Sequence, residues 1–142
     1  MPKPIISESL ISIDGAIPNT TAADVISRLC AMLEAQGYVG PEYVRAVLDR
    51  EARFPTALPT LPFATAIPHG DPVDVHETGV AVAVLEKPIP FGSMDSPGDM
   101  LPVRAVLLMA VAHSSQQVPT LQWVCQMLNR PDMVDRLVQA SS

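Results

Sequence analysis

The chain has 142 residues, of which 48% are hydrophobic and 17% charged, so it can bury a core of its own and is not a disordered tail. A net charge of -6 and the absence of any cluster of Lys and Arg argue against a nucleic-acid-binding surface. The longest apolar run, residues 105–112, is too short for a membrane helix, and the first residues lack the apolar stretch of a signal peptide. We therefore expect a cytoplasmic protein.

The first third of the chain predicts a short strand and two helices. Residues 5–13 mix apolar and polar types and could hold a short strand. Residues 19–21, Asn-Thr-Thr, offer side-chain oxygens that cap a helix, and Gly37 is suited to end it. A second helix is predicted to open at Pro41 and to reach about Arg53.

The middle third predicts buried strands. Residues 54–72 are dense in proline and poor in Gly and Ser, which favours a shaped loop around a short strand over a flexible linker. Residues 78–89 and 103–113 are apolar on both faces, as strands are inside a sheet that helices cover on both sides. The segment between them, residues 90–102, is predicted to be a long loop with a function or an interface.

The last third is predicted to be helical. Leu121, Val124, Cys125 and Leu128 form one apolar stripe, and Pro131 opens a short final helix. The two cysteines, at positions 30 and 125, fall within such helical patterns and are expected to fill the core as free thiols. Together these elements predict one α/β sandwich over residues 1–142, with a mixed central sheet flanked by helices.

His69 is the candidate reactive residue. It follows the run Phe63 to Pro68 and precedes three turn formers, so it should lie just outside the end of a strand, where reactive groups gather in α/β sheets. A neutral imidazole nitrogen is a good nucleophile near pH 7, and we expect one ring nitrogen of His69 to be open to solvent. The alternative from this stretch alone is a surface-turn histidine, or one whose ring bonds a backbone carbonyl.

The surrounding residues resemble a known family. Arg50-Glu51, then Pro55-Thr56, then Ala-Ile-Pro-His at residues 66–69 occur in the order found in EIIA domains of the sugar phosphotransferase system, in the fructose–mannitol–galactitol class. The helices and strands predicted on both sides fit that class too, so the resemblance covers nearly the whole chain.

The resemblance implies that the chain is a phosphotransferase component. His69 would accept a phosphoryl group from the phosphocarrier HPr and pass it to a IIB component, with a membrane reached only indirectly through a IIC component. Arg50 matches the family arginine beside the phosphohistidine, and a guanidinium can bind phosphate oxygens bidentately. From the residues alone, without the motif, Arg50 would be read as a solvated cation at a helix end. No cofactor is implied.

Gln117 stands where mannitol- and fructose-type members have a second histidine. Members that resemble the galactitol-specific branch also have glutamine there, so the resemblance implies a galactitol-like system. An amide can donate a hydrogen bond to phosphate, and Pro119 indicates that Gln117 lies near the amino end of a helix with free backbone donors. Gln117 can equally be a solvated capping residue.

Other candidates have weaker signals. His76 lies in a polar loop and is expected to be exposed, whereas His113 follows a strand and could approach His69. We expect no metal site, because the three histidines match no compact ligand spacing and no cysteines cluster with them. Four apolar residues can either form a rim for docking partners or lie in the core: Phe63, Ile67, Phe91 and Met94. A regulatory EIIA-like domain, which signals by its phosphorylation state without sugar transport, is the alternative function.

Overall fold

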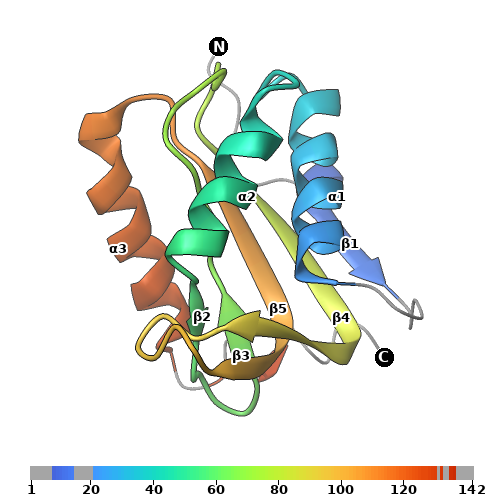
Figure 1. The fold of residues 1–142 in the computed structure, drawn as a ribbon. Coiled ribbons are helices and arrows are strands. Elements are labelled where there is room, and N and C mark those ends of the chain that lie inside the picture. Colours follow the sequence, from blue (N-terminus) through green and yellow to red (C-terminus); the bar gives the residue numbers. More distant parts are fainter. Residues whose placement is uncertain (1–7, 15–20, 131, 133–134, 137–142) are drawn as a thin grey trace.

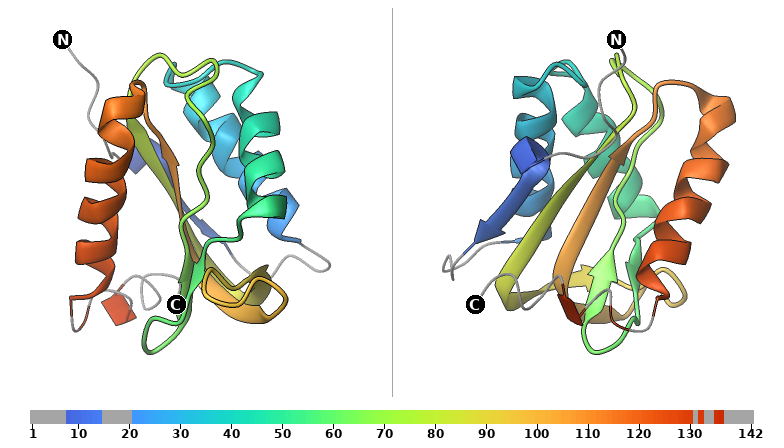
Figure 2. Two further views of the ribbon diagram at one scale, coloured as in Figure 1. Left: turned by 60° about the vertical axis from the view of Figure 1, so that its left-hand side comes forward. Right: turned by 180° about the vertical axis from the view of Figure 1, so that it is seen from behind.

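A five-stranded mixed sheet forms the centre of the computed structural model, which describes residues 8–14, 21–130, 132 and 135–136. The strand order is β1-β4-β5-β3-β2; β1 is parallel to β4 and β3 to β5, whereas β4 is antiparallel to β5 and β2 to β3. Helices α1 and α2 cover one face and α3 covers the other (Figures 1 and 2). The predicted single α/β sandwich is thus confirmed. The strands are β1 (Ile11–Asp14), β2 (Ala57–Leu58), β3 (Ala64–Ala66), β4 (Gly79–Gly92) and β5 (Met100–Ala110), and the helices are α1 (Ala22–Ala35), α2 (Tyr43–Arg53) and α3 (Gln117–Leu128).

Local signals set both ends of α1. The Thr21 hydroxyl accepts from the Asp24 amide at 3.2 Å, and the Asp24 carboxylate accepts from the Thr21 amide at 3.0 Å, a reciprocal capping box. At the other end Gly37 has a φ of 82°, and the Tyr38 amide donates back to the Leu33 carbonyl at 2.9 Å. The left-handed glycine therefore ends the helix in a Schellman motif.

The core lies on both faces of the sheet. Val80, Val82 and Val84 of β4 pack in the cluster that α3 covers, and the residues between them pack in the cluster under α1 and α2. The prediction that this strand is apolar on both faces because helices cover both is confirmed. Cys30 lies on the buried face of α1, and Cys125 is half-buried on α3; both are free thiols.

Several element boundaries differ from the prediction. Strand β4 runs on to Gly92 and strand β5 begins at Met100, so only residues 93–99 connect them. The prediction of a long loop over residues 90–102 is therefore wrong. Strand β2 was not predicted, because two residues among prolines give no periodic signal. The first strand starts only at Ile11, after a 3-10 turn over Glu8–Leu10. The final helix predicted from Pro131 lies largely outside the described residues. No helix in the described part is long and apolar enough to span a membrane.

Candidate phosphoryl-accepting site

His69 lies just beyond the carboxyl end of β3. The Met109 amide donates to the Pro68 carbonyl at 3.0 Å, so the chain keeps pairing with β5 after β3 has formally ended. From there it runs along the sheet edge between α2 and α3 (Figures 1 and 2). The predicted position of His69, at the exit of a strand of an α/β sheet, is therefore confirmed.

The His69 ring is more buried than expected. The residue is only 6% exposed, and its Nδ1 lies 2.8 Å from the Ile67 carbonyl oxygen. A carbonyl can only accept, so Nδ1 carries the proton and Nε2 keeps its lone pair. Within the described chain Nε2 has no hydrogen-bond partner, and it is not among the fully enclosed polar atoms that lack one. The ring is therefore held by one nitrogen, and the other keeps a narrow contact with solvent.

The surroundings of His69 favour the neutral imidazole. Burial lowers its pKa below the ordinary value of 6.5, and the nearby Arg50 guanidinium lowers it further. The hydrogen bond to Ile67 and the charge of Asp71 act in the opposite direction and do not reverse the shift. Near pH 7 the ring is consequently uncharged, and Nε2 keeps its lone pair without help from a base.

Helix α2 holds the backbone after His69. Tyr43, in its first turn, is fully buried; its hydroxyl donates to the Met109 carbonyl at 2.6 Å and accepts from the Gly70 amide at 3.0 Å. Gly70 lies so close to α2 that a Cβ atom there would be 2.9 Å from the backbone carbonyl carbon of Ala46 and the backbone nitrogen of Val47. The chain beside His69 is thus fixed to both the helix and the sheet. Sequence reasoning identified neither Tyr43 nor Gly70 as part of the site.

Arg50 supplies the positive charge of the site from the same helix. Its Nη1 lies 3.8 Å from a carboxylate oxygen of Asp71, and its guanidinium carbon lies 5.4 Å from the centre of the Phe54 ring. Its Nε is the only fully enclosed side-chain nitrogen or oxygen in the described part that has no hydrogen-bond partner. The Arg50 guanidinium also acts electrostatically on His69, where it lowers the pKa of the imidazole.

Glu51 and Thr56 hold the residues before His69. The Thr56 amide and hydroxyl donate to the two Glu51 carboxylate oxygens at 3.0 and 2.8 Å, and the Ile67 amide donates to the Thr56 hydroxyl oxygen at 3.2 Å. Burial raises the pKa of Glu51, and the two bonds from Thr56 oppose that rise. The sequence showed Glu51 and Thr56 only as markers of a family, and the structure shows what they contact.

No hydrogen bond or ion pair of the described residues joins the remaining predicted residues to His69. Gln117 is the first residue of α3 and is half-buried, and no hydrogen bond of the described residues links it to His69. His113 is exposed before a 3-10 turn, and His76 is exposed, as expected, with its Nε2 3.6 Å from an oxygen of Asp74. No group of His, Cys, Asp and Glu in the described part could hold a metal ion.

Of the two positions left open for the four apolar residues, a docking rim or the core, the structure places two residues in the core. Ile67 and Phe91 are buried in the core. Phe63 is half-buried, and the Arg104 guanidinium lies 4.7 Å from the centre of its ring. Met94 alone is exposed. Ile67 follows β3 directly, whose three residues are all buried, and it packs in the core cluster that α3 covers.

Comparison with known proteins agrees with this fold. The family model "Phosphoenolpyruvate-dependent sugar phosphotransferase system, EIIA 2" matches residues 4–142. The galactitol-specific EIIA component of the Escherichia coli phosphotransferase system is 26% identical over 116 residues, 82% of this chain and 77% of that protein. IIA mannitol from Escherichia coli superposes with a TM-score of 0.74 at 26% identity, over 94% of this chain and 89% of that one.

A further solved structure contains a partner. The Escherichia coli complex of enzyme IIA mannitol with phosphorylated enzyme IIB mannitol matches with a TM-score of 0.62 at 28% identity, over 95% of this chain and 97% of that chain. The fold and the matched family model define a IIA phosphoryl carrier of the phosphotransferase system. The chain belongs to the EIIA type 2 family.

Proposed function

We propose that His69 accepts a phosphoryl group on Nε2 from phosphorylated HPr and passes it to a IIB component. The observation that carries this proposal is the hydrogen bond from Nδ1 to the Ile67 carbonyl, because it leaves the lone pair on Nε2. The lowered pKa of His69 and its proximity to Arg50 support the same assignment.

The phosphoryl transfer to His69 needs no general base. The Nε2 lone pair attacks phosphorus, an N–P bond forms, and the bond from phosphorus to the donor nitrogen breaks with its electron pair staying on the donor imidazole. Nδ1 keeps its proton, and the ring acquires positive charge. The Ile67 carbonyl, which accepts from Nδ1, stabilises that charge. Attack by the IIB nucleophile on the same phosphorus reverses these steps and restores the neutral ring.

Arg50 is proposed to bind the oxygens of the transferred group. Its charge is permanent, and its side chain is 39% exposed, so the guanidinium can be reached from solvent. Gln117 and the free amides of the first turn of α3 are proposed as further donors. The Gln117→Ala variant should slow transfer by a few fold, whereas Gln116→Ala should not, because the exposed side chain of the preceding residue accepts from Thr78. Equal rates for both variants would remove Gln117 from the site.

The substrate is proposed to be galactitol or a similar alditol. Support comes from the galactitol-specific relative and from the glutamine at position 117. The IIB partner is supported by the solved complex of a IIA protein with a phosphorylated IIB protein. A IIA component does not itself bind the sugar, so transport assays with cells that carry matched IIB and IIC components would identify it.

Reconstitution tests the phosphoryl transfer. The protein is incubated with labelled phosphoenolpyruvate, Enzyme I and HPr, and the expected product is an acid-labile, base-stable phosphate on this chain. His69→Ala should abolish the label, whereas His113→Ala, which changes an exposed histidine, should not. Label that persists in His69→Ala would overturn the proposal. Label that reaches His69 but never a IIB component would favour the regulatory role.

A further inference from the structure

We infer that Thr56 is a positioning residue: clamped by Glu51, its hydroxyl holds the Ile67 amide and so keeps His69 in the tautomer that leaves Nε2 free. This inference rests on the proposed function of His69 and concerns how the imidazole is oriented. It assigns a role to two residues that contact neither the ring nor a phosphoryl group. The contacts that carry it form one continuous chain from α2 to His69.

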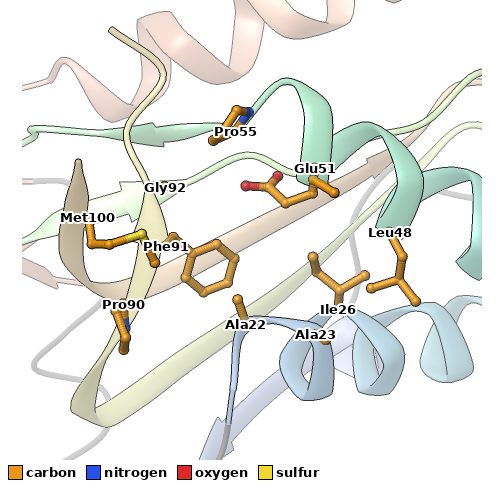
Figure 3. Close-up of a pocket in the computed structure, with 11 residues that line it drawn as sticks. Ala22, Ala23, Ile26, Leu48, Glu51, Pro55, Pro90, Phe91, Gly92 and Met100 are labelled. Atoms are coloured by element: carbon orange, nitrogen blue, oxygen red, sulfur yellow. The ribbon is translucent and has the colours of Figure 1, made fainter. Parts of the chain in front are cut away.

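The first contact is the clamp on Thr56. Both Glu51 oxygens accept from Thr56, one from its amide at 3.0 Å and one from its hydroxyl at 2.8 Å. The carboxylate projects from α2 into an apolar recess beside Pro55 and Phe91 (Figure 3). Among the described residues Thr56 is its only hydrogen-bond partner. A carboxylate in such surroundings holds its donors firmly, because water competes poorly for them.

The second contact replaces a missing strand pair. Ala57 pairs with Ala66 and Leu58 with Thr65, so in the same register Thr56 would be opposite Ile67. The Thr56 backbone amide is instead turned to Glu51, and its side-chain hydroxyl accepts from the Ile67 amide at 3.2 Å. Because the hydroxyl proton is committed to the carboxylate, its lone pairs face the Ile67 amide.

The third contact reaches the imidazole. Proline has no amide hydrogen, so the Ile67 amide is the only backbone donor between Ala66 and His69. The carbonyl of Pro68 is fixed separately, because it accepts from the Met109 amide at 3.0 Å. With the Ile67 amide and the Pro68 carbonyl both held, rotation of the peptide between them is restrained, and the Ile67 carbonyl accepts from Nδ1 at 2.8 Å. Thr56 is therefore two hydrogen bonds away from the proton that defines the tautomer.

Matched variants separate this role from a contribution to stability. Thr56→Val removes the hydroxyl and keeps the shape, and Thr56→Ser restores the hydroxyl. Thr65→Val is the control, because Thr65 is also buried and its hydroxyl contacts Thr60 at 3.1 Å but not Ile67. Two quantities are measured in each full-length variant: the 15N chemical shifts of the His69 ring, which report its tautomer, and the rate of phosphorylation by HPr. Urea unfolding records the stability of each variant.

The wild type, Thr56→Ser and Thr65→Val should show protonated Nδ1 and unprotonated Nε2. Thr56→Val should show a mixture of tautomers and phosphorylation slowed by about tenfold, beyond any loss shared with Thr65→Val. A wild-type tautomer and rate in Thr56→Val, or equal defects in Thr56→Ser and Thr56→Val, would overturn the inference. The tautomer is read without phosphorylation, so failure of the proposed function, seen as unlabelled wild-type protein, is a distinct result.

Discussion

The buried hydroxyl of Tyr43 accepts a hydrogen bond from the Gly70 amide at 3.0 Å, across 27 residues of sequence. The same hydroxyl donates to the Met109 carbonyl at 2.6 Å. One phenol thus joins the start of α2, the chain after His69 and strand β5. Rigid support of this kind matters for a phosphoryl transfer, where a small displacement of the nucleophile slows the reaction.

Tyr43→Phe should destabilise the protein by about 2 kcal/mol, because it leaves the buried Gly70 amide and Met109 carbonyl without their partner. Urea unfolding monitored by circular dichroism measures the change. Tyr38→Phe is the control, since it alters another buried tyrosine whose hydroxyl makes neither of these two bonds. A Tyr43→Phe protein as stable as the wild type would show that other groups satisfy the two backbone atoms.

Gly70→Ala should slow phosphorylation and destabilise the fold by about 1–3 kcal/mol, because the new methyl group meets the backbone of α2. The helix backbone cannot move aside as a flexible side chain would, so the His69 segment has to shift instead. Gly98→Ala is the matched control, since nothing lies within 4 Å of a Cβ atom at that position. Equal stability and equal rates in both variants would contradict the close approach of Gly70 to α2.

The lowered pKa of His69 predicts a pH dependence of stability. The folded protein binds the His69 proton less readily than the unfolded chain, so this contribution is fully present above pH 6.5. It is lost as the pH falls from 6.5 through the lowered pKa of the folded state. Urea unfolding across this range, compared between the wild type and His69→Asn, isolates it because the variant lacks the titrating group.

The same shift predicts that phosphorylation persists below pH 6.5, because Nε2 stays unprotonated there. Initial rates of label transfer from HPr, measured between pH 5 and 8, check this. HPr titrates in the same assay, so its own profile is recorded with a second IIA acceptor as the reference. A rate that declines with an apparent pKa of 6.5 or above for this chain alone would contradict the shift.

Arg50→Met should slow transfer by about a hundredfold while leaving the free energy of unfolding undiminished. The lost charge removes stabilisation of the transferred group. Stability should hold because the change also removes the enclosed Nε that has no partner. Arg50→Lys keeps the charge but loses the bidentate geometry, so its transfer rate should lie between that of the wild type and that of Arg50→Met. A large loss of stability in Arg50→Met would show that the arginine is structural.

The sequence was sufficient for the parts of the fold that repeat a periodic pattern. The alternating residues of β4 predicted a sheet covered on both faces, and Thr21 and Gly37 lie at the ends of α1 as predicted. The sequence did not predict a short element whose existence depends on pairing with a distant segment. Strand β2 exists because it pairs with β3, and nothing within Ala57–Leu58 itself signals it.

In the site, too, the sequence predicted local features but not those that depend on distant residues. The spacing of residues placed His69 at the end of a strand, but its burial and its acceptor, the Ile67 carbonyl, depend on how α2 packs on the segment that follows. Tyr43 gave no signal because a buried aromatic residue in a helix usually only fills the core. Its role depends on two backbone groups that are 27 and 66 residues away.

Arg50 and Glu51 are consecutive residues of α2, yet one pairs with Asp71 beside His69 and the other clamps Thr56. Tyr43, on the same helix, anchors Gly70. Helix α2 therefore carries the guanidinium near His69, the carboxylate that clamps Thr56 and the hydroxyl that anchors Gly70. Because Tyr43 also ties this helix to β5, and the Pro68 carbonyl ties the His69 segment to the same strand, the imidazole and the guanidinium share one rigid frame, and partners that dock in succession would meet the same internal geometry.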